Sequence, residues 1–369
     1  MQKPQKISWK DTNLALIGSD IDRKVKAAAA AGEAAWQGIG RKEGTKVWRI
    51  EQFQVKEWPE DQYGMFYRGD SYIVLNTYKQ GDALKHDIHI WIGSESSQDE
   101  YGTAAYKMVE ADEFLGGAPV QHRQVEGSEC TKFANYFNVL EYLDGGVESG
   151  FRKVVATPEK PLFFRVTSIT AKTVKMIQVP MAKSSMNNRD SFILYAGDDK
   201  VWCWHGENAR PIEKAGSNTW AEKMCTKGTA VVLDQGDDED AEFWSYIGDG
   251  QMGAPIPDEE ELEEFTPTLY RVDGDPSKPL EKVSTGTTLK KGQCKACLDK
   301  QALDDSDVFL LDAGWEIFVW IGKGADISEK IAALGAADRL AEVEPRVKHL
   351  PVTIVKASAE TTDFLYFFR

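Results

Sequence analysis

The sequence predicts an α+β fold in which one unit, a mixed β-sheet between a long and a short helix, occurs three times. An aspartate followed by an alternating apolar run recurs at Asp70, Asp190 and Asp307, at spacings of 120 and 117 residues. A tryptophan-bearing run that ends in glycine follows each time, as IHIWIG, VWCWHG and IFVWIG. Because this period is too long for a solenoid, each unit is predicted to be a domain. The 369 residues, 42% of them hydrophobic, suffice for two or three such cores.

The elements follow the same order in each unit. A short strand with aromatic and basic residues comes first, and the two runs described above come next. A glutamate then opens a helical stretch, and a β-type run, an acidic turn and an aromatic helix close the unit. This β-β-β-α-β-α order predicts a mixed sheet covered by two helices. The opening strands are predicted at Val47–Phe53, Leu162–Ile169 and Thr268–Asp273, and the long helical stretches at Tyr101–Leu115, Lys214–Met224 and Lys330–Leu340.

Two segments lie outside the three copies. The alanine-rich Asp20–Trp36 predicts a helix in an N-terminal extension. The run Gly250–Phe265 is rich in proline and glycine and then acidic, which is typical of a linker. The connection Asp144–Lys160 could span roughly 58 Å when extended. The predicted domains are therefore an extension at 1–44 and repeats at 45–150, 151–255 and 256–369, the last beginning with the acidic linker.

Composition limits the classes of function. A formal charge of −15 and a pI near 5.0 argue against a nucleic-acid binder and fit a chain that binds cations. No run approaches the ~18 apolar residues of a membrane helix, and Met1–Lys10 has no apolar core resembling a signal peptide. The five cysteines, an odd number scattered along the chain, favour reduced thiols. We therefore expect a cytoplasmic protein.

A pair of carboxylates recurs in the three units. Each aspartate that begins a strand is followed, after the next strand, by a glutamate in the first turn of a helix. If the two strands are adjacent, both carboxylates lie at one end of the sheet, where they form an oxygen site suited to calcium. The glutamates also fit helix capping, and the two roles can coexist. The pairs are Asp70 with Glu100, Asp190 with Glu213, and Asp307 with Glu329.

Sequence signatures of catalysis are missing. The five histidines form no HExxH motif, and no phosphate-binding glycine loop occurs. Cys294 and Cys297 form a single CxxC motif without the second pair that a zinc site would need. We therefore expect a binding protein without enzymatic turnover.

The first copy resembles a known family. The runs GDSYIVLNTY, HDIHIWIGSESSQDEYGTAAYKMVEADEFLGGAPVQHRQVEG and GGVESGF are similar to the first repeat of the gelsolin superfamily, and the three copies extend from about Trp48 to Arg369. Three repeats after a short extension resemble severin, fragmin and the earthworm actin modulators. The resemblance implies a monomer in the absence of actin that binds calcium, severs actin filaments, caps their barbed ends and nucleates new filaments. Two rivals stay open: a capping and nucleating module that cannot sever, and a hydrolase that uses the paired carboxylates.

The resemblance also implies individual cation ligands. In the first repeat, one calcium would be held by the carbonyls of Gly69 and Val147 and by the side chains of Asp70 and Glu100. A second calcium, shared with an actin carboxylate, would use Asp112 and the carbonyls of Gly117 and Pro119. The equivalent positions in the other repeats are Arg189, Asp190 and Glu213, and Ser306, Asp307 and Glu329.

Arg189 stands where the first repeat has Gly69, so a positive φ is not expected to be required at this position. A backbone carbonyl remains available whatever the side chain. The guanidinium nevertheless puts a positive charge beside a divalent site, which predicts that the second repeat binds calcium most weakly, unless Arg189 turns to solvent or pairs with an acidic neighbour.

For actin, the resemblance implies that helix Gln98–Leu115 enters the cleft between two actin subdomains. Its contact residues would be Glu100, Ala104, Tyr106, Met108 and Asp112, although an apolar stripe facing the core explains the apolar members equally well. Lys172 and Lys175 occupy the stretch that in the family touches the filament side and phosphoinositides, or else they form a plain solvated edge.

Two departures from the family bear on lipid control and on the compartment. The lysine-rich stretch before GGVxSGF is reduced to Tyr142–Asp144, which leaves phosphoinositide control open. The family's extracellular disulfide would need cysteines where this chain has Ser191 and His205, in keeping with a cytoplasmic protein.

Overall fold

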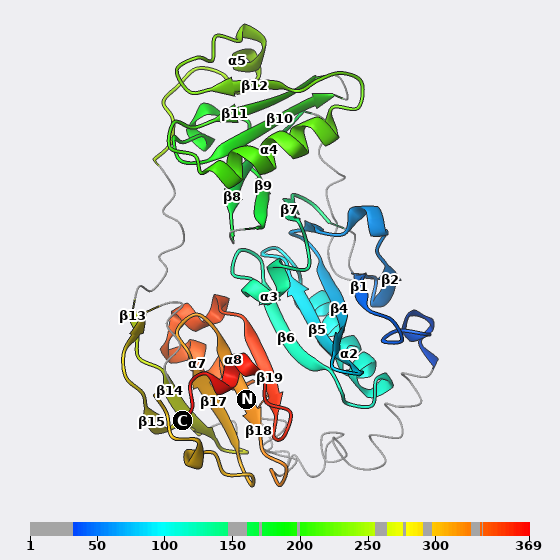
Figure 1. The fold of residues 1–369 in the computed structure, drawn as a ribbon, viewed down its shortest axis with the longest axis vertical. Coiled ribbons are helices and arrows are strands. Elements are labelled where there is room, and N and C mark those ends of the chain that lie inside the picture. Colours follow the sequence, from blue (N-terminus) through cyan, green and yellow to red (C-terminus); the bar gives the residue numbers. More distant parts are fainter. Residues whose placement is uncertain are drawn as a thin grey trace, which may run out of the picture.

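The structure is a computed structural model that describes residues 32–146, 161–169, 172–197, 200–254, 264–275, 278–290, 297–325, 333 and 335–369. It contains three α+β units, each with a five-stranded mixed sheet (Figure 1). In every unit one neighbouring pair of strands is parallel and the other neighbours are antiparallel. The predicted fold class is confirmed.

The first repeat has the strand order β2-β1-β4-β5-β6. Its long helix α2 follows β5, as predicted, and its short helix α3 follows β6. The predicted opening strand ran to Phe53, which is wrong by two residues, because Gln52 and Phe53 turn the β1–β2 hairpin with positive φ angles of 49° and 64°. The elements are η3 (Ala34–Trp36), β1 (Gly44–Glu51), β2 (Gln54–Glu57), η4 (Glu60–Gln62), β3 (Met65–Tyr67), β4 (Ser71–Gln80), β5 (Ala83–Ile92), α2 (Gln98–Phe114), β6 (Val120–Val125), α3 (Thr131–Ala134) and β7 (Val139–Leu143).

The second repeat repeats this plan with the order β12-β11-β10-β8-β9. Helix α4 begins with Pro211 at its first turn, where a missing N–H costs nothing. The elements are β8 (Leu162–Ser168), β9 (Val174–Gln178), η5 (Lys183–Ser185), β10 (Ser191–Gly197), β11 (Lys200–His205), α4 (Pro211–Met224), β12 (Val231–Asp234) and α5 (Ala241–Ile247).

The third repeat has the order β15-β14-β17-β18-β19. The predicted helix Lys330–Leu340 begins outside the described residues, and its described part belongs to α7. The elements are β13 (Glu264–Phe265), β14 (Thr268–Val272), β15 (Glu281–Thr285), β16 (Leu289–Lys290), η6 (Lys300–Ala302), β17 (Val308–Asp312), β18 (Ile317–Ile321), α7 (Ala336–Val343), η7 (Pro345–His349), β19 (Val352–Lys356) and α8 (Thr362–Leu365).

Each sheet separates two hydrophobic clusters, one under the long helix and one under the short helix. In the first repeat Ala104 and Met108 of α2 pack on one face, and Phe133 of α3 packs on the other. Alternating strand side chains supply both faces, which is why the strands read as nearly continuous apolar runs. The predicted sandwich is thus present in all three repeats.

Trp36 joins the N-terminal extension to the first repeat. Its side chain is fully buried and meets Trp48 edge-on, with ring centroids 5.2 Å apart. Glu33, three residues earlier, forms an ion pair with Lys107 of α2 at 2.9 Å. Most of the helix predicted at Asp20–Trp36 lies outside the described residues, but its end is part of the repeat's core.

The repeats share sheets. Strand β6 of the first repeat pairs antiparallel with β19 of the third, and this pairing forms one ten-stranded sheet (Figure 1). Strand β7 leaves the first sheet and lies between β3 and β9, parallel to both, so it completes a seven-stranded sheet with the second repeat. Edge strands expose unpaired backbone groups, and both junctions satisfy them.

Two smaller expectations concern thiols and membranes. Cys130, Cys203, Cys225 and Cys297 are free thiols, and Cys294 of the CxxC motif lies outside the described residues. No helix in the described part of the chain combines the length and apolar composition needed to span a bilayer.

Candidate cation sites

A glycine after each tryptophan-bearing strand positions the aspartate of the same repeat. The amides of Gly93, Gly206 and Gly322 each donate to the carbonyl of the aspartate at 3.0 Å. A Cβ at Gly93 would come within 2.2 Å of the Arg68 carbonyl, and the other two glycines meet backbone at similar distances. Only glycine therefore allows this approach, which explains why all three copies end in it.

In the first repeat Asp70 and Glu100 lie at the same end of the sheet. The hydroxyl of Ser71 is 2.8 Å from that of Ser96, and Ser96 donates to Glu100 Oε2 at 3.3 Å. Asp70 is fully buried and Glu100 is 3% exposed. Both carboxylates of the predicted pair are therefore buried, and a short chain of hydroxyls leads from Ser71, the residue after Asp70, to Glu100.

Glu100 also caps its helix. Its Oε2 accepts from the Ser97 amide at 3.1 Å and from the Ser97 hydroxyl at 3.0 Å. The capping role left open from the sequence is thus realised, and it fixes the carboxylate next to the strand ends. One carboxylate oxygen is enough for these bonds, so capping and metal ligation remain compatible.

The loop after β7 approaches the same site. The Gly69 amide donates to the Gly145 carbonyl at 2.8 Å. A Cβ at Gly146 would lie 2.5 Å from Asp70 Oδ1. Val147, the predicted carbonyl ligand, lies outside the described residues.

An arginine that the sequence reasoning missed faces the aspartate in every repeat. Arg49 of β1 contacts Asp70, Arg271 of β14 contacts Asp307, and Arg165 of β8 lies 3.7 Å from Asp190. The signal was available in the sequence, because each opening strand carries an arginine (VWRIEQF, LFFRVTSI, TLYRVD). Strand pairing then sets the arginine beside the aspartate, where its charge compensates a carboxylate at or near full burial.

In the second repeat the two carboxylates serve separate hydrogen-bond networks. Asp190 accepts from Asn187 Nδ2 at 2.7 Å. Glu213 accepts from the Ser168 amide and hydroxyl at 2.9 Å and from the Arg210 amide at 2.9 Å. Arg189 is exposed to solvent, which is the arrangement that was named as the exception to a weakened calcium site in this repeat.

In the third repeat Asp307 is buried and Ser306 precedes it, held by Asp304, whose carboxylate accepts from the Ser306 amide at 2.9 Å. Gly69, Arg189 and Ser306 are not among the described residues with positive φ. The prediction that this position needs no positive φ is therefore confirmed. Glu329 lies outside the described residues.

The second candidate site of the first repeat contains a basic side chain from the third repeat. Lys356 Nζ lies 2.8 Å from the Gly117 carbonyl and 3.4 and 3.3 Å from the two carboxylate oxygens of Asp112. Burial raises the pKa of Asp112, and the nearby Lys356 opposes that rise. Pro119, the other predicted ligand, directly precedes β6 and is buried.

The chain is similar to proteins of one family along most of its length. The model of the gelsolin repeat matches residues 59–134 and 297–365. Gelsolin-like protein 1 of Lumbricus terrestris is 41% identical over 335 residues, which cover 87% of this chain and 86% of the relative. Severin of Echinococcus granulosus is 35% identical over 370 residues, covering 96% and 95%. The chain belongs to the gelsolin family. It spans 45% of the cytoplasmic gelsolin of Homarus americanus, at 35% identity.

The gelsolin-repeat helix α2 has two faces. Ala104 and Met108 pack in the core, with exposures of 0% and 6%, so the core alternative accounts for both in this conformation. Tyr101 and Tyr106 are 38% and 50% exposed. The exposed side of this helix therefore carries two tyrosines, Tyr101 and Tyr106.

The donor chemistry of the gelsolin-repeat sites fits calcium. The side chains and carbonyls that converge are hard oxygen donors, and none of them is a sulfur or an imidazole. Basic side chains already contact Asp70, Asp190, Asp307 and Asp112, so the protein itself balances the negative charge of these carboxylates. A divalent ion would therefore have to share or displace these contacts.

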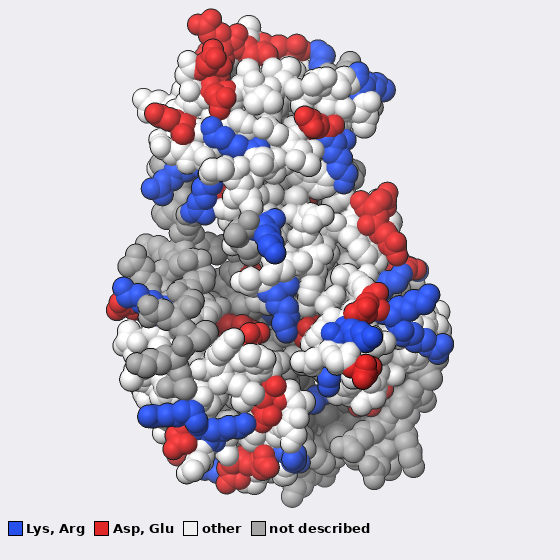
Figure 2. Space-filling view, in the orientation of Figure 1, with Lys and Arg blue, Asp and Glu red and all other residues white. Residues whose placement is uncertain are grey.

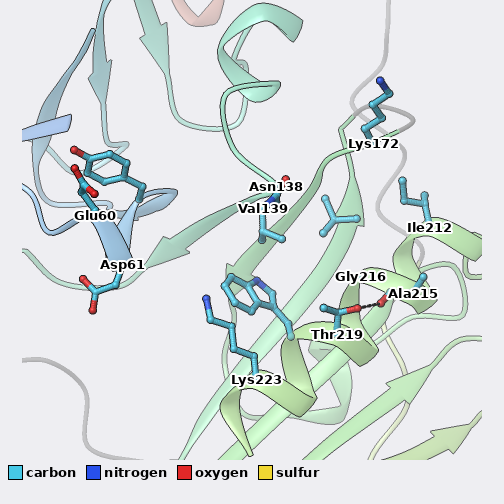
Figure 3. Close-up of a pocket in the computed structure, with 13 residues that line it drawn as sticks. Glu60, Asp61, Asn138, Val139, Lys172, Ile212, Ala215, Gly216, Thr219 and Lys223 are labelled. Atoms are coloured by element: carbon cyan, nitrogen blue, oxygen red, sulfur yellow. Dashed lines mark hydrogen bonds between the residues drawn. The ribbon is translucent and has the colours of Figure 1, made fainter. Parts of the chain in front are cut away.

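Lys172 and Lys175 lie on the second gelsolin repeat, beside the junction with the first. Lys175 is in β9, opposite Leu140 of β7, and Lys172 lines a hollow of about 590 Å³. Figure 3 shows that the wall of this hollow comes from β7 and α4, with Asp61 on the opposite side. Acidic and basic side chains both line it, so the hollow has no single charge.

Acidic side chains gather at the end of the second repeat that carries α5 (Figure 2). The run Asp234–Glu242 has a partly structural role. Asp238 accepts from Trp204 Nε1 at 2.8 Å, and Asp240 accepts from Trp202 Nε1 at 3.0 Å and caps α5. This cluster therefore holds core tryptophans in place.

Proposed function

We propose that this chain severs actin filaments when calcium binds, caps their barbed ends and nucleates new filaments in the cytoplasm. The observation that carries the proposal is the buried carboxylate pair of Asp70 and Glu100 at the start of α2 in a gelsolin-family chain. Hard oxygen donors at this position suit a cation that arrives as a signal, and sensor sites of this kind bind in the range of about 10⁻⁷ to 10⁻⁵ M.

The sharing of sheets supports a switch between two arrangements. In this structure β6 and β19 are paired and Lys356 is bound at the end of α2, so α2 is joined to the third repeat. If calcium binds better to an arrangement in which the repeats separate, it shifts the population toward that arrangement and frees α2. The actin contacts proposed on α2 are Tyr106, Glu100 and Asp112, and Lys172 and Lys175 would contact the filament side.

The test is light scattering and filament length for preformed actin filaments across a calcium titration. Filaments should shorten within the micromolar range of free calcium. Equal shortening in excess chelator would contradict calcium activation. Slower growth at barbed ends without shortening would favour the alternative hypothesis, a capping and nucleating protein that cannot sever filaments.

A further inference from the structure

The end of β19 delivers one ammonium group to three oxygen atoms of the first repeat. Lys356 Nζ contacts the Gly117 carbonyl at 2.8 Å and both oxygens of Asp112 at 3.3–3.4 Å. One carboxylate and a backbone carbonyl are also the donors that a hard cation would use at this position. The lysine therefore stands where a divalent ion would bind.

Strand register explains why the lysine reaches this place. Ile354 of β19 pairs with Gln121 of β6, so Lys356, two residues further on, lies beside the turn between α2 and β6. Gly117 in that turn has a φ of +72°, which directs its carbonyl toward the junction. Lys356 can hold these oxygens only while the two sheets are joined.

Because both are positively charged, Lys356 and a divalent ion cannot occupy these oxygen atoms at the same time. Asp112 is the only side-chain carboxylate that contacts Lys356 in the described part of the chain, and its side chain is 9% exposed. One negative charge balances one ammonium. The Lys356 side chain is 39% exposed, but two cations at the same oxygens would still repel each other across a few ångströms beside a single, mostly buried carboxylate.

We propose that Lys356 is a tethered competitor for the cation at Asp112, and that this competition couples loading of the site to separation of the first and third repeats. The inference rests on the proposed calcium-dependent function and names the residue that sets its threshold. An intramolecular ligand that must leave before the metal binds lowers the apparent metal affinity by the fraction of time it is bound.

Other contacts join the same two repeats without touching these oxygens. Arg123 pairs with Asp338 at 3.0 Å, and His122 Nδ1 lies 2.8 Å from the Thr353 hydroxyl. Loss of one such contact weakens the junction alone. Loss of Lys356 weakens the junction and also vacates the cation position. The two kinds of variant therefore distinguish a residue that only joins the repeats from one that also competes with the cation.

The experiment compares the full chain with Lys356→Met, Asp338→Asn and Lys348→Met. The second variant removes an inter-repeat ion pair, and the third removes a lysine that is exposed on η7. Calorimetry measures calcium binding, and small-angle scattering measures the radius of gyration at each calcium concentration. For Lys356→Met we expect one calcium event to tighten about tenfold, a typical size for coupling between sites, and expansion to begin at lower calcium.

The outcomes separate the alternatives. Calcium binding and expansion equal to the parent in Lys356→Met would overturn the proposal, as would no calcium binding at all in either protein. A shift no larger than that of Asp338→Asn would make Lys356 a simple bridge and would also overturn it. Filament shortening is measured in parallel. If Lys356→Met shows the calcium shift but no variant acts on filaments, the proposed function fails while the competition stands.

Discussion

Arg49 compensates the charge of Asp70 inside the first repeat. The two side chains are 9% and 0% exposed, and the guanidinium also lies 4.9 Å from the centre of the Tyr67 ring. The equivalent arginines of the other repeats face Asp190 and Asp307. This pairing gives the carboxylates a partner in the absence of metal.

Arg49→Met should destabilise the calcium-free protein by about 3–5 kcal/mol, because a buried carboxylate loses its opposite charge. Calcium should restore part of that loss, so calcium-induced stabilisation is larger than in the parent. Urea unfolding with calcium and with chelator measures both. Lys46→Met, which removes exposed ion pairs with Glu57 and Glu60, is the control and should cost less than about 1 kcal/mol. Equal losses in the two variants would contradict the role of Arg49.

Glu100→Gln separates helix capping from metal binding. The amide oxygen can still accept from Ser97, so stability without calcium should change by no more than about 1 kcal/mol. The variant lacks one ligand charge, so the rise in melting temperature on adding calcium should be reduced. Thermal unfolding with and without calcium is the measurement, and Glu113→Gln on the same helix is the matched control. A calcium response equal to that of the parent would remove Glu100 from the site.

Arg189 should weaken calcium binding in the second repeat only modestly, because its side chain has turned to solvent, which is the condition under which a smaller effect was expected. It is exposed, so solvent screens part of the repulsion. Calorimetry on the full chain should show one weak event that disappears in Asp190→Asn and strengthens in Arg189→Gly. Arg189→Lys keeps the charge and should leave that event unchanged. The full chain is needed because β7 of the first repeat completes the sheet of the second. If no calcium-binding event were lost in Asp190→Asn, Asp190 and Glu213 would have a structural role only.

Glu141 should make stability depend on pH. It is 4% exposed in β7, and burial raises its pKa to about 7. Because the folded pKa lies above the unfolded value of about 4.5, the folded state holds the proton more tightly, and stability falls as pH rises from about 4.5 through 7. Glu141→Gln should remove this fall and raise stability at pH 8 by on the order of 1–3 kcal/mol.

Urea unfolding between pH 5 and 8 measures the effect of Glu141. The exposed Glu57→Gln is its control and should keep the slope of the parent. A pH dependence in Glu141→Gln identical to that of the parent would show that this carboxyl is not the source.

The sequence by itself determined the repeated unit and most of its site. The spacing of Asp70, Asp190 and Asp307 and the glycine after each tryptophan-bearing strand are local patterns, and the contacts they predict lie within one repeat. Strand alternation and helix-start signals depend only on neighbouring residues, so they can be recognised without knowledge of the rest of the fold. The expectation that Asp70 and Glu100 lie at one end of the sheet followed from the adjacency of two consecutive strands, and the structure pairs these strands as β4 and β5.

Only the tertiary structure decided the contacts between repeats. Nothing near Lys356 in the sequence indicates Asp112, which is 244 residues away, because the contact depends on the register of β19 against β6. The departure of β7 to the second repeat likewise depends on which edge strand is left unpaired once each sheet has formed. From the sequence, Ala104 and Met108 could equally face the core or contact a partner, because both lie on one apolar stripe of the helix. In the structure they pack against Trp36 and the sheet, so they belong to the core. Local sequence patterns determine the helices and strands. The partner of an edge strand, and the face of a helix that is buried, are determined only when whole repeats pack together.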